Sequence, residues 1–205
     1  MSISIPARAL PLLLLAALAG CGVVPKKTEI SIHDPQPAVQ SDPAWPQVAT
    51  QLVVQRPLAS RILDGNRIVV RPQPGELQVY QGASWVQPAP EMLQTALVRT
   101  LTHSGKLDGV ARRGGGIIGQ YELALELHRF DADYSGGGKP SAVLEVSAQL
   151  IRTDRNQIVA HRVFQASILA NGMSAHDVSD AFEQALAQVS LEISGWSLQT
   201  LHRQP

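Results

Sequence analysis

The sequence has one cysteine, no excess of charge of either sign, and no apolar run long enough to cross a membrane. A single cysteine in 205 residues excludes an internal disulfide and any zinc site built on two or more thiolates. Because 17 Lys and Arg residues balance 17 Asp and Glu residues, no basic excess points to nucleic acid as a partner. The length suits one folded domain, and a hydrophobic content of 44% is too low for a protein with several membrane spans.

The N-terminus has the order of features of a secretion signal that ends at the single cysteine. Arg8 supplies a positive charge, residues 9–18 are apolar, and Ala19 and Gly20 are small. The apolar run is shorter than the roughly 20 residues of a spanning helix, so residues 1–20 are predicted to be a signal peptide.

Residues 18–21, Leu-Ala-Gly-Cys, resemble the lipobox of bacterial lipoprotein precursors at every position. The resemblance implies cleavage before Cys21, a diacylglycerol on its sulfur, and a fatty acid such as palmitate on its new amine. Cys21 is therefore the predicted lipid attachment site, and acylation would hold the chain on a membrane that it does not span. The alternatives are an ordinary secretion signal that ends in Cys, or a buried free Cys.

The residue after the cysteine bears on which membrane holds the anchor. In lipoproteins of this kind, an Asp directly after the Cys implies retention at the inner membrane, whereas here the next residue is Gly22. The resemblance therefore implies the periplasmic face of the outer membrane, with the inner membrane as the alternative.

Residues 21–46 are predicted to form the lipidated cysteine and a flexible tether. Prolines recur from Pro25 to Pro46, and no helical or strand period is visible. Fully extended, residues 22–46 would reach roughly 80 Å. The folded domain is predicted to occupy residues 47–205, with Trp45 at the junction.

The pattern of the domain predicts strands and two helices. Seven segments have the alternation or the β-branched composition of strands: 51–55, 67–71, 76–80, 107–110, 121–128, 144–150 and 157–167. A helix is predicted over residues 90–103, where leucines recur every four residues, and a second helix after Ser174, which with Asp177 resembles a capping box. Gly195 is expected to weaken or kink this second helix.

The long strands alternate apolar and polar residues, as in an antiparallel sheet that is covered on one face. The helices carry apolar stripes that need a partner surface. The predicted fold is therefore α+β, with a mostly antiparallel sheet and two helices packed on one face.

No motif in the chain predicts catalysis. Gly114, Gly116 and Gly119 match the spacing of a dinucleotide-binding loop, but a strand pattern follows where the phosphate site needs a helix. This stretch is predicted to be a flexible loop. We predict no catalytic residue, no cofactor and no enzymatic activity.

The histidines and paired carboxylates give only weak candidates for chemistry. His128 and His161 could meet across strands, which is the best metal or acid–base candidate in the chain. Asp131 and Asp133 share one strand face. Solvated strand positions are the more common state for all four, so no metal site is predicted.

Tyr80 and Trp85 are the candidate aromatic residues for binding a partner. They flank a predicted turn at residues 81–84, just before the first helix. Either both cap the hydrophobic core, which we favour, or they form an exposed platform for a partner.

Four stretches of the domain carry a further pattern: Arg61-Ile62, Ile68–Pro72, Gly75–Trp85 and Pro88–Leu97. They contain a strand that ends in Tyr, a short turn, a Trp and a Leu-rich helix. This order behind a lipobox resembles the ABC-type transport auxiliary lipoproteins, the paraquat-inducible-protein C type, over residues 48–200. In that family a short strand often follows the tether, and here residues 28–32 and 51–54 compete for its place.

The resemblance implies docking rather than catalysis. Such lipoproteins accompany ATP-driven systems with a mammalian-cell-entry (MCE) domain protein, which move phospholipids or other apolar molecules across the envelope. The implied partners are the membrane, through the lipid anchor, and the MCE-domain protein, while a homo-oligomer is conjecture. Two alternatives stay open: a lipid carrier with an apolar pocket between sheet and helices, and a structural lipoprotein of envelope assembly.

Overall fold

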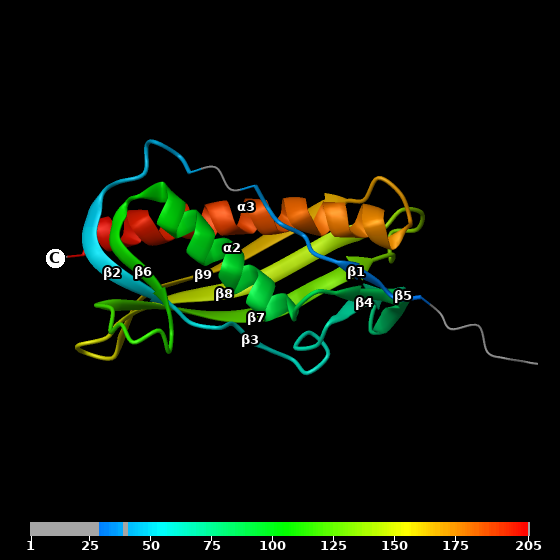
Figure 1. The fold of residues 1–205 in the computed structure, drawn as a ribbon, viewed down its shortest axis with the longest axis horizontal. Coiled ribbons are helices and arrows are strands. Elements are labelled where there is room, and N and C mark those ends of the chain that lie inside the picture. Colours follow the sequence, from blue (N-terminus) through cyan, green and yellow to red (C-terminus); the bar gives the residue numbers. More distant parts are fainter. Residues whose placement is uncertain (1–28, 39–40, 205) are drawn as a thin grey trace, which may run out of the picture.

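The structure is a computed structural model that describes residues 29–38 and 41–204. The predicted signal peptide, Cys21 and the first part of the predicted tether lie outside these residues. The described part forms one sheet with two helices (Figure 1). In chain order the elements are β1 (Ser31–His33), β2 (Val48–Val54), β3 (Leu58–Ala59), β4 (Arg67–Arg71), β5 (Gln78–Trp85), α2 (Ala89–Ser104), β6 (Leu107–Arg112), β7 (Tyr121–Asp133), β8 (Ser141–Arg152), β9 (Gln157–Leu169) and α3 (Ala175–His202).

Strand β7 organises the sheet. One of its edges pairs with β8 in a long antiparallel ladder, and β9 extends this ladder on the far side of β8. Its other edge pairs in turn with β2, β3 and β4, all parallel to it. Strand β5 is antiparallel to β4, whereas β1 and β6 run parallel to β5 and β2. The two longest ladders are antiparallel and confirm the predicted α+β fold with a mostly antiparallel sheet. The parallel pairings of the short strands make the sheet mixed.

A bulge in β7 changes which residues face the helices. The pairing with β8 shifts between Leu127 and Arg129. Before the shift the odd-numbered residues are buried, and after it Phe130 and Ala132 take the inward positions. The bulge interrupts the alternation of apolar and polar residues. For this reason the strand predicted from that alternation ended at residue 128 rather than at Asp133.

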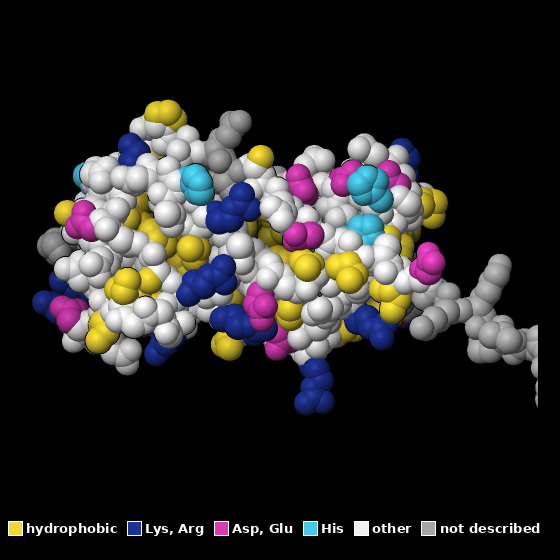
Figure 2. All heavy atoms as spheres, in the orientation of Figure 1, with side chains coloured by type: hydrophobic (Ala, Val, Ile, Leu, Met, Phe, Trp, Pro, Cys, Tyr) yellow, Lys and Arg dark blue, Asp and Glu magenta, His cyan; other side chains and the backbone are white. Residues whose placement is uncertain are grey.

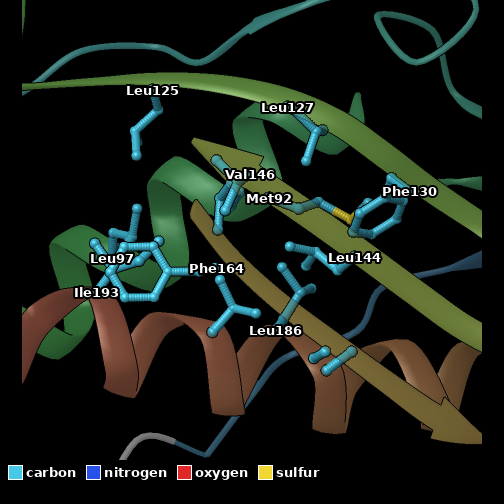
Figure 3. Packing of buried hydrophobic residues seen from close by; sticks show 14 of the residues in the cluster. Met92, Leu97, Leu125, Leu127, Phe130, Leu144, Val146, Phe164, Leu186 and Ile193 are labelled. Carbon is cyan, nitrogen blue, oxygen red and sulfur yellow. The ribbon is translucent and has the colours of Figure 1, made fainter. Parts of the chain in front are cut away.

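Both helices lie on the same face of the sheet. Helix α3 packs along β8 and β9, and α2 packs against α3 and β6 (Figure 1). The predicted capping box is present, since the Ser174 hydroxyl accepts from the Asp177 amide and the Asp177 carboxylate accepts from the Ser174 amide. Figure 3 shows Leu97 of α2, Ile193 of α3 and Phe164 of β9 pointing toward one another in the core between the layers.

The chain before residue 47 is more ordered than the sequence predicted. Ser31–His33 form β1, which joins the sheet beside β5, so the prediction of an unstructured tether up to residue 46 is wrong for these residues. Trp45 is buried, with 7% of its surface exposed. A strand of three residues next to prolines is too short for its alternation of apolar and polar residues to be recognised. The partners of β1 and of Trp45, which are β5 and Gly195, lie far along the chain.

One further prediction on local structure is wrong. The predicted turn at residues 81–84 is strand, because β5 continues to Trp85 with Gly82 at a φ of 71°. Helix α3 continues past Gly195 to His202. A Cβ at residue 195 would lie 2.8 Å from Nε1 of Trp45, so this glycine makes room for the indole ring.

Candidate functional site

Several segments converge at the end of the molecule that carries β1, which we call the β1 end. It comprises β1, β5, residues 129–141 with the β7–β8 connection, and residues 169–180 with the start of α3. The Ala170 amide donates to the Pro140 carbonyl at 2.9 Å, which joins two of these segments. The β1 end is also where the described chain begins after the predicted lipid attachment site.

Strand β1 is fixed to its neighbours by backbone and side-chain contacts. The Val86 amide donates to the His33 carbonyl at 2.9 Å, and the Ser31 hydroxyl donates to the Gly82 carbonyl at 3.2 Å. Beyond the strand, the Gln36 amide donates to the Glu183 carboxylate of α3 at 3.1 Å. The first described residues are therefore bound to both the sheet and a helix.

The imidazole of His33 lies close to charged groups at the start of α3. Burial lowers the pKa of His33, the nearby His176 lowers it further, and Asp180 opposes the change. His176 Nδ1 is itself 3.7 Å from the Asp180 carboxylate. The neutral form of His33 is thus favoured while β1 is docked.

Tyr80 joins three segments of the β1 end through hydrogen bonds of its hydroxyl group. Its hydroxyl is hydrogen-bonded to that of Tyr134, and it donates to the Met173 carbonyl at 3.1 Å. Burial raises the pKa of Tyr80, and the contact with Tyr134 raises it further. The side chain therefore connects β5, the β7–β8 connection and the loop before α3, and it is half-buried rather than displayed on the surface.

Trp85 lies in the core. Only 1% of its surface is exposed, and its ring meets Phe182 edge-on at 5.3 Å and Phe130 at 5.8 Å. Phe130 and Phe182 stack at 4.3 Å. These aromatic contacts join α3 to β5 and β7, and burial leaves Trp85 no free surface for a partner.

Asp131 and Asp133 belong to an ion cluster rather than to a solvated strand end. Asp131 is 2% exposed and accepts from the guanidinium groups of Arg71 and Arg129, the latter at 2.7 Å. Arg129 also donates to Asp133 at 2.7 Å. The expectation of solvation is wrong here because Arg71 comes from β4, which pairs with this part of β7.

The pKa values of this cluster agree with its geometry. Burial alone would raise the pKa of Asp133, but hydrogen bonds from Ser135 and Arg129 outweigh it and lower the pKa to about 2. The hydrogen bond to Asp131 raises the pKa of Arg129. All charges in the cluster are thus held in pairs, which is a structural role and leaves no free acid or base.

The other candidates for chemistry are not brought together. Strand β8 separates His128 on β7 from His161 on β9, and His128 is hydrogen-bonded to Ser147 at 2.6 Å. No group of three metal-ligating side chains occurs within residues 29–38 and 41–204. The loop with Gly114 joins β6 to β7 and precedes no helix.

Two surface hollows accompany this packed interior. One of about 580 Å³ opens at the opposite end from β1 and is lined mainly by polar side chains such as Gln47, Thr50 and Arg152. The other, of about 360 Å³, lies between residues 34–37 and α2. The larger hollow lies between strands β2, β7 and β8 and the C-terminal end of α3. Farther in, large apolar side chains fill the space between the sheet and the helices (Figure 3).

Sequence reasoning missed the role of β1 at this site. The segment Ile30-Ser31-Ile32-His33 alternates apolar and polar residues, which was the available signal. The strand was not predicted as part of the sheet because it is only three residues long, although residues 28–32 were one of two candidates for the strand after the tether. The structure contains both candidates, because residues 48–54 form β2 as well.

By its fold, the described part is an α+β domain in which two helices cover one face of a mixed sheet. Neither helix of the described part is both long and apolar enough to span a membrane. The model of the family "ABC-type transport auxiliary lipoprotein component" matches residues 31–194. The chain belongs to this family, and the match begins at the first residue of β1.

Solved structures share the fold. A protein from Xanthomonas campestris is 44% identical, with a TM-score of 0.82, and the match covers 84% of this chain and 97% of that one. An uncharacterised protein matches 81% of this chain and 97% of its own at 18% identity, with a TM-score of 0.63, and supports the fold alone.

A longer relative matches as well. An uncharacterised protein of Bradyrhizobium diazoefficiens is 22% identical over 185 residues, which is 90% of this chain. The chain spans about half (48%) of the length of that relative.

Proposed function

We propose that the protein is a lipid-anchored periplasmic component of an MCE-type ABC transport system. It docks the system to the outer membrane while phospholipids or other apolar molecules cross the envelope, and it performs no catalysis. One observation carries this proposal: the family match over residues 31–194 begins ten residues after Cys21, the last residue of the lipobox.

The position of β1 shortens the tether that the proposal needs. Ten peptide units separate Cys21 from Ser31, the first residue of β1, and at about 3.3 Å each they span at most roughly 33 Å. The domain would therefore be held close to the membrane, rather than at the roughly 80 Å that an unstructured chain up to residue 46 allows.

A short anchor also gives an energetic reason for docking. Attachment to a membrane confines the domain near any partner that reaches the same membrane, and this raises its effective concentration. A modest affinity between the domain and the MCE-domain protein is then sufficient. The packed interior of the domain supports docking over a carrier role, which would need an apolar cavity for lipid.

Co-purification tests the proposed partner. The acylated chain with a C-terminal affinity tag is crosslinked in its native cells and purified in mild detergent. The proposal expects an MCE-domain protein among the captured proteins, and at least severalfold less of it with the Cys21→Ser variant, which keeps the domain but loses the anchor. Failure of the acylated chain to capture any MCE-domain protein would count decisively against the proposal.

Incorporation of palmitate tests the anchor separately. Cells given labelled palmitate are expected to yield a labelled mature chain for the natural sequence and no label for Cys21→Ser. A mature, unlabelled natural chain would contradict the anchor whatever the partner is.

A further inference from the structure

Large apolar side chains are exposed at the β1 end. Ile30 and Ile32 have 66% and 69% of their surface exposed. Leu169, the last residue of β9, and Met173, in the connection from β9 to α3, have 65% and 61% exposed. Figure 2 shows hydrophobic side chains along the end that carries β1 in Figure 1. Isolated exposed apolar residues are common, but a group at one end of a molecule needs a reason.

Ile32 lies within β1, and Ile30 directly precedes this strand. Ser31 and His33 alternate with the two isoleucines. Ser31 contacts Gly82, and His33 lies near His176 and Asp180 at the start of α3. Since side chains on a strand alternate between its faces, Ile30 and Ile32 point together to the other side. Ile32 lies beside Ser84 of β5, and β1 has no neighbour on its outer edge among the described strands.

The covalent chain brings this patch to a bilayer. Nine peptide units separate Cys21 from Ile30, a span of at most roughly 30 Å. With acyl chains on Cys21, the end of the domain that holds Ile30 is the end that stays nearest to the lipid. Lys26 and Lys27 lie between the two and suit anionic headgroups, partly offset by Glu29.

We propose that the β1 end is a membrane-contact surface: Ile30 and Ile32, with Leu169 and Met173 at the same end, lie in the headgroup region of the bilayer that holds Cys21. This inference rests on the proposed anchor. The contact would orient the domain, with the polar hollow at the opposite end and the ends of β2 and α3 turned away from the membrane and toward the periplasm.

The single natural cysteine makes a clean test possible. With the sulfur of Cys21 acylated as proposed, a Cys introduced by Ile32→Cys is the only free thiol, and it can carry a fluorophore in the full acylated chain. The matched control is Ile118→Cys in the loop before β7, where the side chain is 91% exposed. Both proteins are reconstituted in vesicles of phosphatidylethanolamine and phosphatidylglycerol that contain a headgroup-region lipid quencher.

The expected result is at least twofold stronger quenching by the lipid for the label at residue 32 than at residue 118. Addition of Ile30→Asp to the Ile32→Cys chain should bring the quenching down toward the control value. Equal quenching at the two sites, with both proteins bound to vesicles, would overturn the proposal while leaving the anchor intact.

Two other outcomes are distinct. In one, the label at residue 32 is not quenched by lipid but becomes more shielded from aqueous iodide as the protein concentration rises. This result would show that a second copy covers the patch and would overturn membrane contact. An acylated chain that does not sediment with vesicles would overturn the anchor and this inference with it.

Discussion

Gly195 is the residue whose role depends most on a distant partner. In an exposed helix, Gly→Ala stabilises by about 1 kcal/mol, because Ala loses less backbone entropy on folding. Here the added Cβ would lie 2.8 Å from Nε1 and 3.2 Å from Cε2 of the buried Trp45. The steric effect therefore opposes helix propensity at this position.

We expect Gly195→Ala to lower the free energy of unfolding by about 1–3 kcal/mol, the usual cost of overpacking. Urea denaturation measures it. The matched control is the same substitution in a Trp45→Ala background, where the clash is gone and Ala should be neutral or stabilising relative to Trp45→Ala alone. A single Gly195→Ala chain more stable than the natural one would show that the indole does not pack on residue 195.

The ion cluster around Asp131 gives a second prediction for single residues. Asp131→Ala leaves the guanidinium group of Arg71, which is 22% exposed, without its carboxylate, while Arg129 keeps Asp133 as a partner. We expect a loss of about 2–4 kcal/mol in the free energy of unfolding, since an unpaired buried charge is costly.

The surface pair of Arg56 and Asp64 serves as the control for that prediction. Both side chains are 42% exposed, so Asp64→Ala should cost less than about 1 kcal/mol in the same denaturation experiment. Equal effects of the two substitutions would mean that the Asp131 cluster is no more than a surface pair.

Among the elements, β1 is the one whose docking should respond to pH. Docking lowers the pKa of His33 below its usual 6.5, so the undocked strand binds a proton more readily than the docked one. The stabilisation is therefore complete above pH 6.5 and is lost as the pH falls through the lower, docked pKa.

Hydrogen exchange can measure this. The protection factor of the Val86 amide, which donates to the His33 carbonyl, should fall as the pH drops below 6.5. The Trp85 amide donates to the Asn66 carbonyl within the sheet and should keep its protection. In the His33→Gln variant the Val86 protection factor should no longer vary with pH, and a persistent dependence there would assign the effect to another group.

At the scale of the whole molecule, the proposed docking requires that the anchor be in the right membrane. Gly22 follows the predicted acylated cysteine, and an Asp at this position implies retention at the inner membrane in lipoproteins of this kind. We expect the natural chain in the outer-membrane fraction of a sucrose gradient and Gly22→Asp in the inner-membrane fraction. Gly22→Ser should behave as the natural chain does, and an inner-membrane natural chain would contradict the proposed location.

The sequence predicted the parts of the fold that depend on local pattern. Both helices and most strands follow from periodicity, and the Ser174 cap follows from its spacing to Asp177. The burial of Asp131 and Trp45 did not follow, because their partners, Arg71 and Gly195, are far away in sequence. Tyr80 and Trp85 were correctly seen as neighbours of the core, but their contacts with Tyr134, Phe130 and Phe182 needed the folded chain.

The sequence by itself determined the predicted secretion signal, the lipobox at Cys21, the α+β class and the resemblance to transport auxiliary lipoproteins, because each is written in neighbouring residues or in a repeated spacing. Only the tertiary structure decided that β1 belongs to the sheet, that Trp85 lies in the core with Tyr80 packed against it, and that exposed isoleucines lie at the end where the described chain begins. The physical reason is that strand pairing and burial depend on residues that are distant along the chain and meet only when it folds.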